Sequence, residues 1–89
     1  MKIKSGFVLE EVGGEYLAVA VGKRAKEFSG MVRLNSTGAF FWNLMADKDI
    51  SKEEIIDIVL AKYTGVDREQ VSRDVDNLVK TLTEGGILE

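Results

Sequence analysis

The stretch Met31-Val-Arg-Leu-Asn-Ser-Thr-Gly-Ala-Phe-Phe-Trp-Asn-Leu-Met45 decides how the rest of the chain is organised. Its first four residues alternate with a period of two, which is typical of a β-strand. Asn35 and Ser36 follow, and their side-chain oxygens can accept hydrogen bonds from the free N–H groups of a first helical turn. The apolar residues beyond them recur at helical spacing. This stretch therefore predicts a strand followed by a helix over about Thr37–Ala46.

Before this junction the sequence favours β-structure. Phe7–Val12 and Glu15–Val21 are rich in strand-forming residues and flank Gly13-Gly14, which predicts a tight hairpin because primed turns need positive φ angles. The segment 22–30 then connects to the third strand. We interpret its basic residues as a solvated loop and expect Phe28 to fold back onto the sheet.

After the junction the sequence favours helices. Ser51-Lys-Glu-Glu54 matches a capping box and predicts a second helix whose apolar face includes Tyr63, with Gly65 as its C-cap. Asp67-Arg-Glu-Gln70 predicts the start of a third helix that extends to about Glu84. The expected buried stripe of this third helix consists of Val71, Val75, Leu78 and Leu82.

The ends of these elements complete the predicted core. Gly85-Gly86 should stop the third helix, and Ile87-Leu88 should fold back as an apolar clamp. In the first helix we expect Phe41, Leu44 and Met45 to anchor the core and Trp42 to pack at its margin. A further residue of that helix, Gly38, suggests a close approach of two backbones.

The order of elements is β-β-β-α-α-α, which predicts one α+β domain over residues 1–89. A small three-stranded antiparallel sheet should be followed by a three-helix bundle. Such a sheet has free edges, and a free edge can pair with another strand. A peptide is one candidate for that strand, and a second copy of the chain, which would give a homodimer, is another.

Composition excludes several kinds of chemistry. The chain contains no cysteine and no histidine, so it lacks thiolate nucleophiles, the commonest general base and the usual ligands of transition metals. We therefore expect no cofactor, no metal and no catalytic site. No signal peptide is visible and no apolar run approaches the roughly 20 residues of a membrane span, so a cytoplasmic location is expected.

The central block resembles the signature of the PqqD-like family. In that family an LN-x-TGA segment leads into a helix that contains aromatic residues, as Leu34-Asn-Ser-Thr-Gly-Ala-Phe-Phe-Trp-Asn-Leu-Met45 does here. The resemblance extends from about Phe7 to Leu88. Other matching residues are Ser51-Lys-Glu-Glu-Ile55, Asp74-Val75, Leu78, Leu82 and Gly86-Ile-Leu88.

The resemblance implies a winged-helix-like, non-catalytic domain that recognises the leader of a ribosomally made, post-translationally modified precursor peptide. The leader would add as a strand to the third strand, beside the third helix, and the domain would present it to a radical S-adenosylmethionine maturase. Strand addition gives main-chain hydrogen bonds, and side-chain pockets give selectivity. The expected peptide-binding residues are Met31, Val32, Arg33 and Leu34 on the strand and Ser72, Asp76, Val79 and Thr83 on the helix.

Two other functions compete with this one. A winged-helix DNA-binding regulator would need a basic recognition helix, but the net charge is −3 and the third helix is rich in acidic residues, so nucleic acid is not the expected partner. An enzyme would need paired carboxylates, for which Glu53/Glu54 or Asp74/Asp76 are the candidates. Helix-surface carboxylates are usually solvated, so catalysis is the weaker interpretation. Val79, flanked by polar residues, is either extra core or the wall of a groove.

Overall fold

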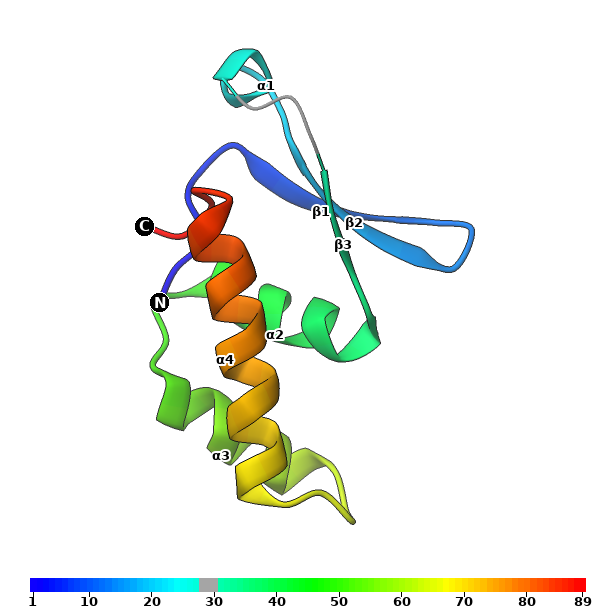
Figure 1. The fold of residues 1–89 in the computed structure, drawn as a ribbon, viewed down its shortest axis with the longest axis vertical. Coiled ribbons are helices and arrows are strands. Elements are labelled where there is room, and N and C mark those ends of the chain that lie inside the picture. The colour runs from blue at the N-terminus through cyan, green and yellow to red at the C-terminus, as the bar shows by residue number, and fades with distance from the viewer. Residues whose placement is uncertain (28–30) are drawn as a thin grey trace.

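The computed structural model describes residues 1–27 and 31–89 and contains a small sheet that lies against a group of helices (Figure 1). The expected position of Phe28 lies outside the described residues. The elements are β1 (Phe7–Val12), β2 (Glu15–Ala20), α1 (Arg24–Glu27), β3 (Met31–Leu34), α2 (Ser36–Asp47), α3 (Lys52–Lys62) and α4 (Arg68–Glu84). The predicted α+β fold, with three strands followed by three main helices, is confirmed.

The sheet is antiparallel and its strands lie in the order β1-β2-β3. Gly13 and Gly14 form the β1–β2 turn with φ angles of 59° and 82°, as the predicted hairpin requires. Ala18 pairs with Leu9 on one side and with Val32 on the other, and this row faces the helices. One face of the sheet therefore packs against the helices and forms part of the core.

Side-chain caps begin the three main helices. The Asn35 side chain accepts a hydrogen bond of 2.7 Å from the Gly38 N–H, and Asp67 accepts one of 2.8 Å from Gln70. Ser51 and Glu54 form the predicted reciprocal capping box. The hydrogen bond from the Ser51 backbone lowers the pKa of Glu54 from its ordinary value.

The two ends of the chain lie side by side and close one end of the core (Figure 1). Ile3 forms a β-bridge with Leu88, and the Lys4 N–H donates to the Ile87 carbonyl at 2.9 Å. Ile87 is buried, so the predicted apolar clamp is confirmed. The terminal ammonium of Met1 also lies 2.7 Å from Asp49 and lowers the pKa of that carboxyl group.

The core is a single cluster that joins the inner face of the sheet to α2, α3 and α4. Phe41 and Met45 are fully buried, as expected, and Leu44 is partly buried and packs against the core cluster. Trp42 is only 2% exposed. The expectation that it packs at the margin of the core is therefore wrong, because Trp42 belongs to the buried cluster to which the chain ends, α3 and α4 also contribute.

Two further expectations about the elements are corrected. The connection before β3 contains a one-turn helix, α1, which was expected to be loop. Its Arg24 donates to the Ser5 carbonyl and to Glu27. The helix α3 ends at Lys62, so Tyr63 is its extended C-cap residue instead of part of its buried face, and Gly65 turns the following loop with a φ of 79°. None of the described helices has the length and apolar character needed to cross a membrane.

Candidate functional site

The strand β3 forms one edge of the sheet. It pairs with β2 on one side, and no strand among residues 1–27 and 31–89 pairs with its other side. Backbone N–H and C=O groups along such an edge remain available to another extended chain. The first property of the site is therefore an open edge of Met31–Leu34.

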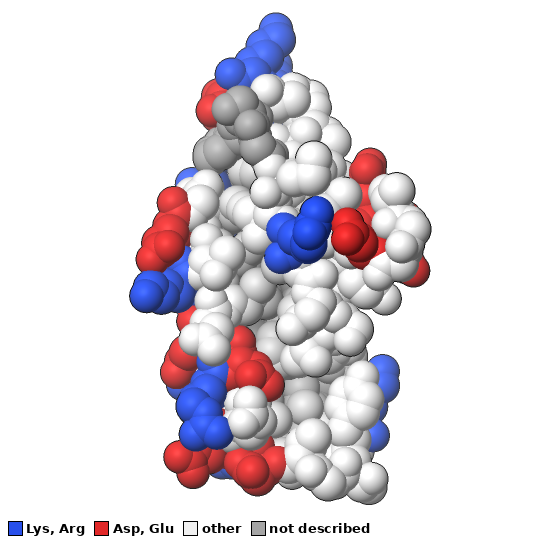
Figure 2. Space-filling view, turned by 45° about the vertical axis from the view of Figure 1, so that its right-hand side comes forward, with Lys and Arg blue, Asp and Glu red and all other residues white. Residues whose placement is uncertain are grey.

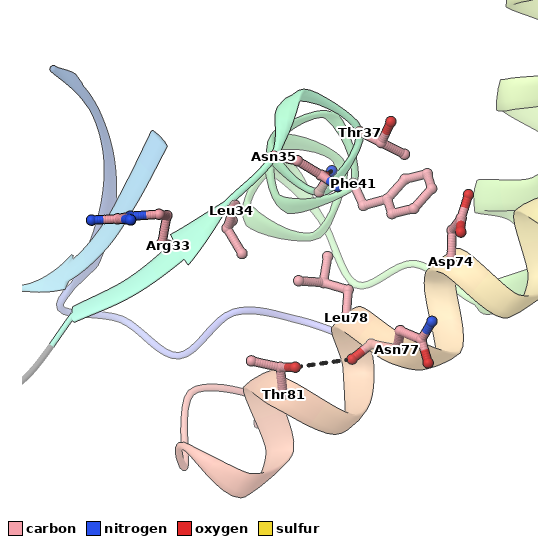
Figure 3. Close-up of a pocket in the computed structure, with 10 residues that line it drawn as sticks. Arg33, Leu34, Asn35, Thr37, Phe41, Asp74, Asn77, Leu78 and Thr81 are labelled. Carbon is pink, nitrogen blue, oxygen red and sulfur yellow. Dashed lines mark hydrogen bonds between the residues drawn. The ribbon is translucent and has the colours of Figure 1, made fainter. Parts of the chain in front are cut away.

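A cleft of about 260 Å³ lies between β3, the start of α2 and the middle of α4 (Figure 3). We call it the β3–α4 cleft. Its lining residues are Arg33, Leu34, Asn35, Thr37, Gly38, Phe41, Asp74, Asn77, Leu78 and Thr81. The space-filling view shows an uncharged surface down the middle of this face, interrupted in its upper half by a basic side chain with an acidic one beside it, while most other charged side chains lie toward the margins (Figure 2).

The apolar side chains of the cleft belong to the core. Leu34, Phe41 and Leu78 are 8%, 1% and 8% exposed, so only small parts of them reach the cleft. A Cβ atom at Gly38 would lie 3.2 Å from the Asn35 Oδ1 atom that caps the helix, which is a tight contact, and 3.4 Å from the Leu34 Cβ. Glycine therefore leaves room for the capping side chain of Asn35 and for Leu34, and the neighbours it accommodates are side chains instead of the second backbone that the sequence suggested.

The polar side chains of the cleft are exposed or half-buried, and half of them come from α4. Thr81 donates to the Asn77 carbonyl at 3.1 Å, and Asp74 accepts a hydrogen bond of 2.9 Å from the Gln70 side chain. At the strand end, Arg33 lies 3.6 Å from Glu15 in an exposed ion pair. This arrangement can offer hydrogen bonds and a shaped surface to a ligand.

The structure brings together only part of the predicted peptide-binding set. Arg33 and Leu34 line the cleft. Met31 is 62% exposed but lies outside the cleft lining, and Val32 packs against the core. The predicted helix residues Ser72, Asp76, Val79 and Thr83 do not line the cleft.

Those four helix residues lie on the other flank of α4. Asp76 forms a 2.9 Å ion pair with Lys52 at the start of α3, and Val79 is partly buried against the core. The expectation that this face looks across the groove at β3 is thus corrected. Side chains of α4 advance by about 100° per residue, so the buried stripe has two flanks and either one fits the same sequence pattern.

Sequence reasoning missed Asp74, Asn77 and Thr81 as residues of the cleft. Their spacing of three and four residues, like that of the predicted set, follows the edge of the buried stripe. Choosing between the two flanks requires knowledge of which side of α4 faces β3. That relation joins segments far apart in the chain, so no local signal reveals it.

The candidate catalytic carboxylates do not converge. Glu53 pairs with Arg68 at 3.1 Å, whereas Glu54 belongs to the capping box. Asp74 and Asp76 lie on opposite flanks of α4. In the part of the chain that the structure describes, no group of acidic side chains is close enough together to hold a metal ion.

Two solved structures and one family model resemble this chain over nearly its whole length. A solved structure titled "TbiB1 in Complex with the TbiA(beta) Leader Peptide" matches with a TM-score of 0.74 and 27% identity, over 100% of this chain and 95% of that chain. Another, titled "Lasso peptide synthetase B1 complexed with the leader peptide", matches with a TM-score of 0.73 and 19% identity, over 99% and 95% of the two chains, and supports the fold alone. No curated protein matches significantly. The family model of coenzyme PQQ synthesis protein D matches residues 8–88, and the chain therefore belongs to the PqqD family.

Proposed function

We propose that this protein binds the leader segment of a ribosomally made precursor peptide and presents the precursor to a separate modifying enzyme. The observation that carries the proposal is the open edge of β3 beside the β3–α4 cleft. Membership of the PqqD family supports it, as does the likeness to TbiB1, which was solved with a leader peptide.

Strand addition is the proposed mode of binding. A leader lying along Met31–Leu34 would form main-chain hydrogen bonds with the free side of β3 and extend the sheet to a fourth strand. Each such bond contributes only about 0.5–1.5 kcal/mol net, because both partners give up hydrogen bonds to water. The edge therefore positions the leader but supplies only part of the affinity.

The remaining affinity and the selectivity come from leader side chains that enter the cleft. Apolar leader residues would contact the exposed parts of Leu34 and Leu78, while Asn77 and Thr81 would offer polar partners. A leader carboxylate could replace Glu15 as the partner of Arg33. Exchanging one exposed ion pair for the other would change the binding free energy by at most about 1 kcal/mol.

We further propose that the chain acts without chemistry of its own and that its partner is a radical S-adenosylmethionine maturase. The scattered carboxylates support a binding role, and the family resemblance supports this enzyme class. A DNA-binding role is disfavoured because the arginines of α4 already have acidic partners. Arg68 pairs with Glu53 and Asp57, and Arg73 pairs with Glu69. Self-pairing of β3 into a homodimer is the competing use of the same edge.

A backbone-directed titration tests the proposal. The probe is the fluorescein-labelled leader of the short precursor encoded beside this protein, measured by fluorescence polarisation. A series of leaders, each N-methylated at one successive residue, should lose affinity at every second position, because alternate residues of an added strand point their N–H groups toward β3. Uniform tolerance of N-methylation would exclude strand addition.

Two controls complete this experiment. Binding of the unmodified leader must be seen at micromolar concentration, and its absence both with and without the maturase would reject the leader-binding function. Size-exclusion chromatography with and without leader separates peptide binding from homodimer formation. The proposed partner is tested by co-purification with the leader-loaded protein. A radical S-adenosylmethionine maturase is compared in this assay with modifying enzymes of other classes.

A further inference from the structure

A second cavity of about 260 Å³ lies where the start of α2, the end of α3 and the start of α4 meet. We call it the helix-end pocket. Its apolar lining consists of Phe40, Phe41, Val59, Tyr63, Val66 and Val71. Phe41, Val59 and Val71 are buried members of the core, so they form a pre-built apolar floor.

This pocket adjoins the β3–α4 cleft. Thr37, Phe41 and Asp74 line both cavities. In the close-up, the ring of Phe41 lies between the end of β3 and Asp74, on the side of the cleft away from Thr81 (Figure 3). A peptide strand that runs along β3 and continues past Leu34 would therefore arrive at the helix-end pocket.

The aromatic wall of the pocket is held in place. The rings of Phe40 and Tyr63 meet edge to face, with centroids 5.9 Å apart and an interplanar angle of 84°. The ammonium group of Lys62 lies 4.7 Å from the Phe40 ring centroid and 5.6 Å from that of Tyr63. Because α3 ends at Lys62, the extended Tyr63 turns its ring toward α2 instead of continuing the helix.

Part of this apolar surface is left exposed. Tyr63 is 45% exposed and Val66 is 41% exposed, although both line a pocket whose floor is core. Among the described residues that line the pocket, only Asp74 is charged, and it already accepts a hydrogen bond from Gln70. The Lys62 ammonium lies against the Phe40 and Tyr63 rings and is not part of the lining. An apolar group fits these surroundings, because the lining itself offers an added carboxylate apolar walls and the like charge of Asp74.

We propose that the helix-end pocket is a second recognition site, which takes one apolar side chain, aromatic or branched aliphatic, from the leader residues that flank the segment paired with β3. This inference rests on the proposed leader-binding function. The leader is the occupant that fits best, because the two cavities share Thr37, Phe41 and Asp74 and a peptide that lies along β3 would therefore pass next to the helix-end pocket. The buried floor and the packed aromatic wall make the pocket ready before the leader arrives, which lowers the entropic cost of binding.

A matched pair of substitutions tests the pocket. Val66→Asp places a carboxylate at the mouth of the pocket and should weaken binding of the fluorescein-labelled leader at least tenfold. Val12→Asp makes the same change at another exposed valine, 57% exposed on the far hairpin strand, and should leave the affinity within twofold of wild type. Thermal unfolding of both variants checks that each is folded at the temperature of the titration.

Combining Val66→Asp with an alanine scan of the leader identifies the occupant. At one apolar leader position outside the N-methyl-sensitive segment, substitution by alanine should weaken binding to the wild-type protein. The same alanine substitution should cause no further loss of affinity for the Val66→Asp variant, because the pocket is already disabled. Equal losses in both proteins, or a Val66→Asp variant with wild-type affinity, would overturn the pocket but leave strand addition standing. A dimer that dissociates on Val66→Asp with unchanged leader affinity would assign the pocket to a second copy. No leader binding by the wild type would reject the function itself.

Discussion

Along α4, Asp74, Asn77 and Thr81 lie toward β3, whereas Ser72, Asp76 and Val79 lie on the flank that meets α3. The α3 flank is engaged within the molecule, because Asp76 pairs with Lys52 and Val79 packs on the core. The β3 flank borders an open cleft, and its polar side chains have mostly local partners.

This difference separates residues that stabilise the fold from residues that can meet a ligand. A flank covered by another helix gains stability from contacts within the chain and has little surface left for a partner. A flank opposite a sheet edge keeps room for one more strand. The two flanks have similar compositions, so their neighbours in space decide their roles.

The largest expected effect on stability comes from the buried stripe of α4, which lies between the two flanks. Leu82 is 0% exposed, and Leu82→Ala should lower the free energy of unfolding by about 2–5 kcal/mol, because it leaves a cavity between α4 and the core. Urea denaturation followed by circular dichroism measures this change. A loss below about 1 kcal/mol would mean that the stripe is not closely packed.

The next largest effect tests the α3 flank. Val79→Asp places a carboxylate against the core and should lower the free energy of unfolding by about 1–3 kcal/mol. Leader affinity of the folded protein should stay near wild type, in contrast to the sequence-based expectation that this residue lines the groove. Asn77→Asp, a change to the same residue on the exposed β3 flank, is the stability control. A stable Val79→Asp variant with impaired binding would move the groove to the α3 flank.

Two exposed threonines give a direct contrast of binding between the flanks. Thr81→Arg should obstruct the β3–α4 cleft and weaken leader binding at least tenfold, or about 1.4 kcal/mol, with little change in stability. Thr83→Arg adds the same side chain two residues further along the same helix, outside the cleft lining, and should leave affinity unchanged. Equal effects of the two substitutions on polarisation titrations would argue for general electrostatics and against the cleft.

The smallest effect concerns the ion pair of the α3 flank. Lys52→Ala removes the partner of Asp76 and should cost about 0–1 kcal/mol of unfolding free energy, since both groups are partly exposed and solvent screens them. The loss should shrink at high salt. Lys80→Ala, at a position without an acidic partner among the described residues, is the control for removing a lysine from this part of the molecule. A loss above about 2 kcal/mol would show that the pair is coupled to packing.

Much of the fold follows from local patterns. The Gly13-Gly14 turn, the Asn35, Ser51 and Asp67 caps and the buried stripe of α4 all involve residues within a few positions of one another. Backbone φ preferences, capping hydrogen bonds and helical periodicity act over the same short range. These features could therefore be predicted correctly, as could the family.

The packing relations between elements far apart in the chain could not be predicted in this way. The burial of Trp42, the turn of Tyr63 toward Phe40 and the flank of α4 that faces β3 depend on which elements pack together. The sequence by itself determined that α4 has one buried stripe and that β3 precedes α2. Only the tertiary structure decided that Asp74, Asn77 and Thr81 border the open strand edge, because the rotation of a helix about its axis is set by the summed packing of its neighbours and by no single residue of the helix.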